Sequence, residues 1–171
     1  MEELLDCDYK IVTIDSKCAD YYNSTVCDFY VNLDEPLRNV YKFNVITELL
    51  NIPNNSALNI VLDPVYINLN NMNRLIGKDK LDNKITKYNI NAFDSLIIEN
   101  TIVTNDGGNT TIKNDYNSSD TVYYLNPQEP QLSRFNIKLY NKNNLIIPIT
   151  SINRFVMKIG VYYNNKKLLR S

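Results

Sequence analysis

The sequence predicts an all-β protein, a single antiparallel jelly-roll sandwich of about eight strands over residues 1–171 with short polar termini. Two observations favour this fold class. Apolar and aromatic residues alternate with polar residues in many short runs, and turn-forming residues separate these runs. No segment has the repeat of a convincing amphipathic helix. The pattern alone fits a jelly roll and an immunoglobulin-like order of strands equally.

The first two strands are expected before residue 34. Tyr9–Ile14 alternates only in part, as a half-buried strand does. Val26–Leu33 alternates more regularly, so we expect one apolar face. The residues on that face are Cys27, Phe29, Val31 and Leu33. Asp34–Leu37 predicts a turn, because Pro36 fixes its own φ and restricts the residue before it.

Val40–Leu50 predicts a longer strand. The residues expected on one of its sides are Tyr41, Phe43, Val45 and Thr47. Its end at Glu48–Leu50 is also compatible with a helix. We favour a strand, because the preceding residues are β-branched and aromatic.

The remaining strands follow the same pattern of alternation. They are expected at Ala57–Leu69 (interrupted by Pro64), Phe93–Val103, Val122–Leu125, Leu132–Tyr140 and Phe155–Tyr162. Turns or loops are expected at Ile52–Ser56, Asn70–Asn83, Asn114–Asp120, Pro127–Pro130 and Asn141–Asn144. Asn105–Asn109 gives the strongest hairpin signal, because its two glycines readily adopt the positive φ of a type I′ turn.

The inward-facing positions of these strands predict the core. The expected core residues are Phe29, Val31, Phe43, Val45, Ile67, Ile97, Ile137, Leu139 and Phe155. Arg134 and Lys138 share the opposite face of their strand, where they are either solvated or paired with a neighbouring subunit. Paired tyrosines, such as Tyr123–Tyr124 and Tyr162–Tyr163, are either strand-end core residues or interface anchors.

Several short motifs resemble a known family when they are taken in order. They are Ile14-Asp15-Ser16, Asp28–Leu33, Pro36–Val40, Val65–Leu69, Leu132–Tyr140 and Phe155–Ile159. Their order and spacing resemble those of the single jelly-roll capsid proteins of large nucleocytoplasmic DNA viruses, which include penton and minor capsid proteins. In that pattern Pro36–Val40 is the corner before a long strand. The segment Asn70–Asn91 has no counterpart in it.

Composition excludes several function classes. The 18 basic and 19 acidic residues give a formal net charge of -1, so we expect no direct nucleic-acid binding. The basic cluster of Lys166, Lys167 and Arg170 is interpreted as a solvated tail. No apolar run is long enough to span a bilayer. The acidic start at Met1–Asp6 does not resemble a secretory signal.

The sequence predicts no catalytic residue, no cofactor-binding residue, no cofactor and no metal site. Histidine is absent, so carboxylates or lysines would have to act as bases. Asp15, Asp28 and Asp63 show no pairing in the sequence. Three cysteines (Cys7, Cys18 and Cys27) lack zinc-ligand spacing, and we interpret them as free thiols in a reducing compartment.

The resemblance implies a structural role and no enzymatic activity. We expect a penton or minor capsid subunit of a large DNA virus, made in the reducing host cytoplasm and located in the virion shell. Its expected partners are other major and minor capsid subunits and copies of itself, arranged as a homopentamer. The alternative is a ligand-binding β-sandwich of lectin type, because tyrosine and asparagine suit sugar stacking and hydrogen bonding.

Overall fold

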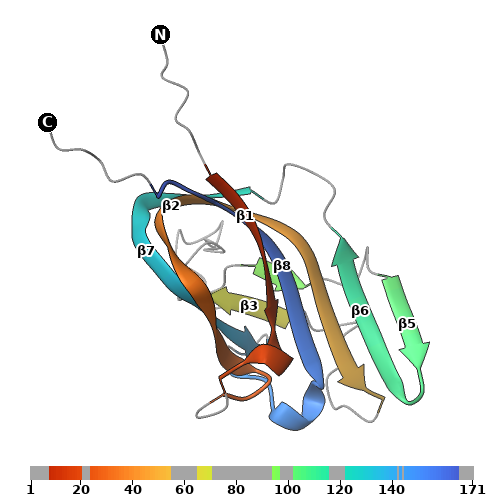
Figure 1. The fold of residues 1–171 in the computed structure, drawn as a ribbon. Coiled ribbons are helices and arrows are strands. Elements are labelled where there is room, and N and C mark those ends of the chain that lie inside the picture. The colour runs from red at the N-terminus through yellow and green to blue at the C-terminus, as the bar shows by residue number, and fades with distance from the viewer. Residues whose placement is uncertain are drawn as a thin grey trace, which may run out of the picture.

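A computed structural model describes residues 8–20, 24–54, 65–70, 94–96, 102–115, 122–141, 143 and 145–165. The strands in this part are β1 (Asp8–Asp15), β2 (Asp28–Pro53), β3 (Val65–Leu69), β4 (Asp94–Leu96), β5 (Ile102–Asp106), β6 (Asn109–Asp115), β7 (Val122–Tyr140) and β8 (Arg154–Tyr163). Two short 3₁₀ turns lie between these strands: η1 (Ser16–Cys18) follows β1, and η4 (Ile149–Ser151) precedes β8. All pairings between these described strands are antiparallel. The predicted all-β class is confirmed (Figure 1).

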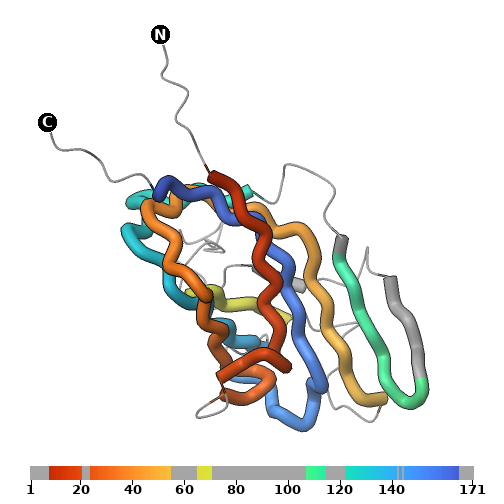
Figure 2. Tube along the Cα trace, viewed as in Figure 1, coloured from red at the N-terminus to blue at the C-terminus, as the bar shows by residue number. Residues whose placement is uncertain are grey.

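Strand β2 takes part in two layers of the molecule. Its first half pairs with β7, from Asp28 opposite Lys138 to Val40 opposite Glu129. Its second half pairs with β8 and, near its end, with β6. Figure 2 shows β2 rising along one side of the molecule, bending over its top and descending on the other side. We call these parts β2a (28–40) and β2b (42–53).

The pairings therefore give two layers. The first layer has the order β1–β8–β2b–β6–β5, and the second has the order β2a–β7–β3–β4. Aromatic contacts join the layers through the core. The Phe29 and Phe155 ring centroids are 6.4 Å apart, and those of Phe43 and Phe135 are 6.0 Å apart.

Most of the expected core is confirmed. The expected residues that are buried are Phe29, Phe43, Val45, Ile67, Ile137, Leu139 and Phe155. Val31 is only half-buried, although it packs against the core. Ile97 lies outside the described residues. The burial of these seven widely separated side chains shows that alternation identified the inward face correctly at their positions.

Two of the three turns expected at prolines are wrong, and the third, Ile52–Ser56, starts later than expected because β2 continues to Pro53. Asp34–Leu37 belongs to β2, whose register shifts between Asn32 and Leu37, so the extra residues bulge out and the strand continues. Pro36 is tolerated there because β2a pairs only with β7 among the described strands, and proline can occupy such an edge. Pro127–Pro130 likewise lies within β7. The Asn126–Pro127 peptide bond is cis.

Register shifts also change which side of β2b faces inward. Phe43 and Val45 are buried, as alternation predicts, but the register shifts between Val45 and Thr47. After this bulge Glu48 and Leu50 are buried and Thr47 is not, so the expected position of Thr47 on the inner side is wrong. The preference for strand over helix at Glu48–Leu50 is confirmed.

The expected hairpin is confirmed. Asp106 pairs with Asn109 across the tip between β5 and β6. The φ values of Gly107 and Gly108 are 52° and 91°, and positive φ at both central residues is what a type I′ turn requires. The Asn141 turn is also confirmed, because the Asn141 side chain accepts hydrogen bonds from the backbone N–H groups of Asn143 and Leu145.

Gly160 allows an aromatic ring to cover β8. A Cβ atom at this position would lie 2.5 Å from the Tyr9 hydroxyl oxygen and 2.6 Å from a ring carbon. Tyr9 lies on the neighbouring strand, opposite Tyr162. The glycine is therefore required by the close approach of Tyr9.

We expect Gly160→Ala to lower the free energy of unfolding by about 1–3 kcal/mol, because the added methyl group displaces the Tyr9 ring. Urea denaturation checks this value. The double variant Tyr9→Ala/Gly160→Ala is the control and should be no less stable than Tyr9→Ala alone. Two fully additive losses would show that the clash with Tyr9 is not the cause.

Candidate functional site

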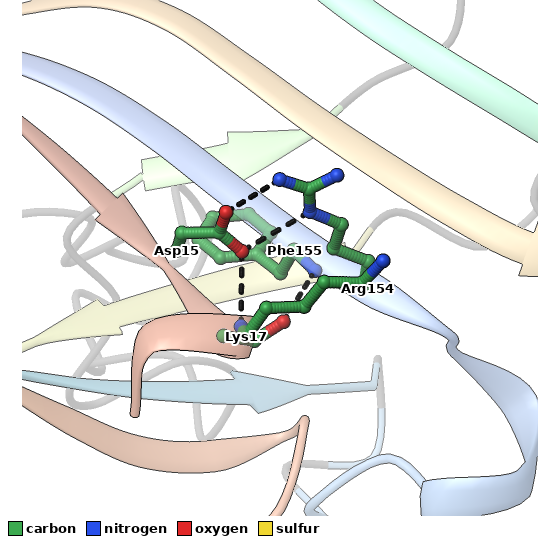
Figure 3. A network of polar contacts seen from close by, with 5 residues as sticks. Asp15, Lys17, Arg154 and Phe155 are labelled. Atoms are coloured by element: carbon green, nitrogen blue, oxygen red, sulfur yellow. Dashed lines mark hydrogen bonds and ion pairs between the residues drawn. The ribbon is translucent and has the colours of Figure 1, made fainter. Parts of the chain in front are cut away.

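A network of polar contacts fixes the end of β1 to β8 (Figure 3). Arg154 donates hydrogen bonds from Nε and from Nη2 to the two carboxylate oxygens of Asp15, the first over 3.1 Å. The Lys17 backbone N–H donates to the same carboxylate over 2.9 Å, which caps η1. Ser16 Oγ accepts from the Phe155 N–H over 3.0 Å. The carboxylate is thus engaged in holding the chain and is not available as a catalytic base.

Arg154 also controls the charge of Asp15. The side-chain hydrogen bond from Arg154 is the main cause that lowers the Asp15 pKa from its ordinary value of 3.8, against an opposing effect of burial. The same bond raises the pKa of Arg154. The pair is therefore charged throughout the neutral range. Of the other two aspartates considered above, Asp28 lies at a groove on β2a, and Asp63 lies outside the described residues.

The two described cysteines differ in exposure. Cys18 is exposed and Cys27 is buried, and both are free thiols, as predicted; Cys7 lies outside the described residues. Burial, with a smaller contribution from Asp28, raises the pKa of Cys27 to about 12. Its Sγ lies 4.0 Å from the Pro148 carbonyl oxygen. Because the thiolate is the nucleophile, Cys27 is inert in the folded protein.

A polar groove of about 590 Å³ lies along β2a and β7. Its lining residues are Asp28, Tyr30, Asn70, Glu129, Gln131, Leu132, Ser133, Arg134, Asn136 and Lys138. Arg134 lies over the Tyr30 ring, 5.5 Å from its centroid. Asn70 has a φ of 50° and its side-chain oxygen accepts from the Asn136 N–H over 2.6 Å, so one wall of the groove is fixed to β7.

A row of four side chains runs along the outer surface of the first layer and ends on β7, where the start of β7 pairs with β2b. Tyr9 is opposite Tyr162, Tyr162 is opposite Lys42, and Lys42 is opposite Tyr124. The row therefore joins β1, β8, β2 and β7, and we call it the tyrosine–lysine row. The Tyr9 and Tyr162 ring centroids are 4.6 Å apart. Lys42 Nζ lies 3.8 Å from the Tyr162 centroid and 5.8 Å from the Tyr124 centroid.

This row is open to solvent at its two ends. Tyr9 is 45% exposed and Tyr124 is 75% exposed. Partial burial, with a smaller effect of Tyr162, raises the Tyr9 pKa, so the phenol stays neutral. An exposed aromatic row with a central cation is typical of a contact surface, since tyrosine is enriched at interfaces and cations interact favourably with aromatic faces.

The sequence predicted part of this surface. It pointed to Tyr123–Tyr124 and left core and interface roles open; Tyr123 is in fact buried and Tyr124 exposed. It missed Tyr9 and Lys42, because their proximity depends on pairing between distant strands. Alternation did place Lys42 on the face opposite Phe43, which was the only signal for it.

Within residues 8–165, apart from the stretches not described, no three His, Cys, Asp or Glu side chains lie close enough to hold a metal ion. No helix in the same residues is long and apolar enough to cross a membrane.

We expect Asp15→Asn to lower the free energy of unfolding at pH 7 by about 1–2 kcal/mol, because it removes a charge-assisted bond. A lowered native pKa means that the stabilisation is present above the unfolded pKa and is lost as the pH falls through the native pKa. The difference from wild type should therefore shrink below about pH 4. Urea denaturation at pH 7 and pH 3 measures it. Asp8→Asn, at the exposed start of β1, is the control; an equal loss at both pH values would contradict the assignment.

We expect Cys27 to resist thiol reagents until the protein unfolds. In the variant Cys7→Ser/Cys18→Ser, which retains only Cys27, a disulfide reagent at pH 8 should label no thiol in the native protein. In urea it should label the single thiol rapidly. Labelling at the same rate in both states would show that Cys27 is accessible.

The chain matches none of the protein-family models against which it was compared, and no curated protein matches it. The function proposed next therefore depends on the strand order, the surfaces and the sequence motifs of this chain.

Proposed function

We propose that the protein is a structural virion protein, a single jelly-roll subunit at a vertex or another position in the shell of a large DNA virus. Its role is structural: it buries surface against other capsid proteins and against copies of itself, most favourably as a pentamer. It carries out no catalysis. It is made in the reducing host cytoplasm, which agrees with the free thiols of Cys18 and Cys27.

The observation that carries this proposal is the order of the strands. When β2a and β2b are counted separately and the extra hairpin strand β5 is left out, the described strands number eight. The first layer then joins strands one, eight, three and six, and the second joins strands two, seven, four and five. A double-sheet jelly roll of two Greek keys has this order.

The positions of the family-like motifs give a second argument. Ile14-Asp15-Ser16 spans the end of β1, where Asp15 and Ser16 bond β8. Pro36–Val40 forms the corner at which β2 passes between layers, and Asn39 there has a φ of 51°. Leu132–Tyr140 forms the last part of β7. The matching residues thus occupy structural corners and strands, which favours a shared architecture over chance similarity.

A lectin-like module is the second candidate. The groove beside Arg134 and Tyr30 favours it, because polar side chains and an accessible aromatic ring suit sugar recognition. A glycan array with the purified protein tests it. Specific binding that is lost in Tyr30→Ala and Asn136→Ala variants would support this candidate.

The proposed structural role is tested in purified particles. We expect mass spectrometry to find the chain at a fixed copy number, and a reconstruction of the particle to place it in the shell, with five copies around each vertex. Its absence from particles would refute the structural role. A shell position away from every symmetry axis would refute only the pentamer.

A further inference from the structure

Besides the tyrosine–lysine row, the molecule has an acidic surface that bears on assembly. Asp34 and Glu35 are exposed on the bulge of β2a, where the register shifts between Asn32 and Leu37. Neither carboxylate forms an ion pair with a described residue. β2a pairs only with β7 among the described strands, so this acidic bulge projects from an open edge of the second layer.

The acidic bulge and the tyrosine–lysine row lie at the same end of the molecule. Arg38, which follows the bulge closely, donates its N–H to Asn165 Oδ1 and accepts at its carbonyl from the Asn164 N–H, both over 3.0 Å. These two asparagines directly follow β8, whose Tyr162 belongs to the row. Figure 2 shows the start of β1, the end of β8 and the bend of β2 together at this end.

The two surfaces nevertheless face different sides. The row lies on the outer face of the first layer, and the bulge lies on the edge of the second layer. A head-to-tail contact, in which the bulge of one copy meets the row of the next copy, therefore suits these surfaces better than a self-complementary contact between two copies. Head-to-tail contacts of this kind close into rings when the rotation allows it.

We propose that the acidic bulge of one copy docks on the tyrosine–lysine row of the next copy. Lys42 is the central cation of the row, and Asp34 and Glu35 supply the opposite charge. Tyr9 and Tyr124 flank the contact and exclude water from it, which strengthens the attraction between the charges. This inference rests on the proposed structural role and names the surfaces that the subunits would use.

A charge-swap experiment with the full-length chain tests the contact. Sedimentation velocity over a range of protein concentrations at low salt measures self-association of the wild type. We expect Lys42→Glu, and separately Asp34→Lys/Glu35→Lys, to weaken association about tenfold or more. The triple variant, which exchanges the charges, should recover affinity to within about threefold of wild type.

Two further variants separate this contact from general effects. Lys158→Glu makes the same charge change on the same face, opposite Thr13 and away from the row, and should alter association by less than about threefold. Tyr124→Ser removes an exposed ring without changing charge and should also weaken association. Circular dichroism of every variant verifies that the fold is retained.

The proposed contact is overturned if the wild type stays monomeric at the highest concentration, if Lys158→Glu acts as strongly as Lys42→Glu, or if the triple variant fails to recover. Its failure is distinguishable from failure of the structural role. A particle reconstruction that places the chain in the shell with other surfaces in contact would refute the docking alone. Absence from the particle would refute the structural role whatever the solution result.

Discussion

The structure depends on one long strand that serves two layers. β2 pairs with β7 along its first half and with β8 and β6 along its second half, so the layers cannot separate without breaking this strand. β7 reinforces the join, because Val122–Tyr124 pairs with β2 just beyond the bend. The core residues Phe29 and Phe43 both belong to β2 and contact rings of the opposite layer. Continuity of the backbone therefore fixes how the two apolar faces meet.

Bulges make this continuity compatible with a buried core. The strand register shifts at three places, between Asn32 and Leu37, between Val40 and Lys42, and between Val45 and Thr47. The second and third shifts change which side of the strand faces inward, since the buried positions move from Val40 to Phe43 and from Val45 to Glu48. The first shift exposes two carboxylates, and the second leaves Lys42 facing outward between two tyrosines. The features that bend the strand thus also produce the surfaces assigned to assembly.

Sequence patterns predicted the all-β class, most of the core and the Gly107–Gly108 hairpin, because these depend on local alternation and turn chemistry. They failed at Pro36 and at Pro127–Pro130. A proline rules out a strand only where that strand is paired on both sides, and whether a strand lies at an edge is a tertiary property. The burial of Glu48 was also missed. The bulge between Val45 and Thr47 changes which residues face inward, and no local sequence pattern marks this bulge.

The candidate surfaces were even less predictable. The tyrosine–lysine row unites Tyr9, Lys42, Tyr124 and Tyr162, which come from four strands spread over most of the chain. The Asp15–Arg154 pair likewise joins residues 139 positions apart. Only the strand order brings these groups together. The tyrosine–lysine row therefore exists only because β2 is shared between the layers.

Backbone NOEs of the isotopically labelled protein measure this sharing most directly. We expect cross-strand NOEs from β2 to both layers, for example between Asn32 and Arg134 and between Asn51 and Arg154. Lys42 should show contacts to both Tyr124 and Tyr162. The backbone chemical shifts of residues 34–37 should have the values typical of an extended strand. A tight turn at those residues, with NOEs from β2 to one layer only, would show that β2 is not shared between the layers.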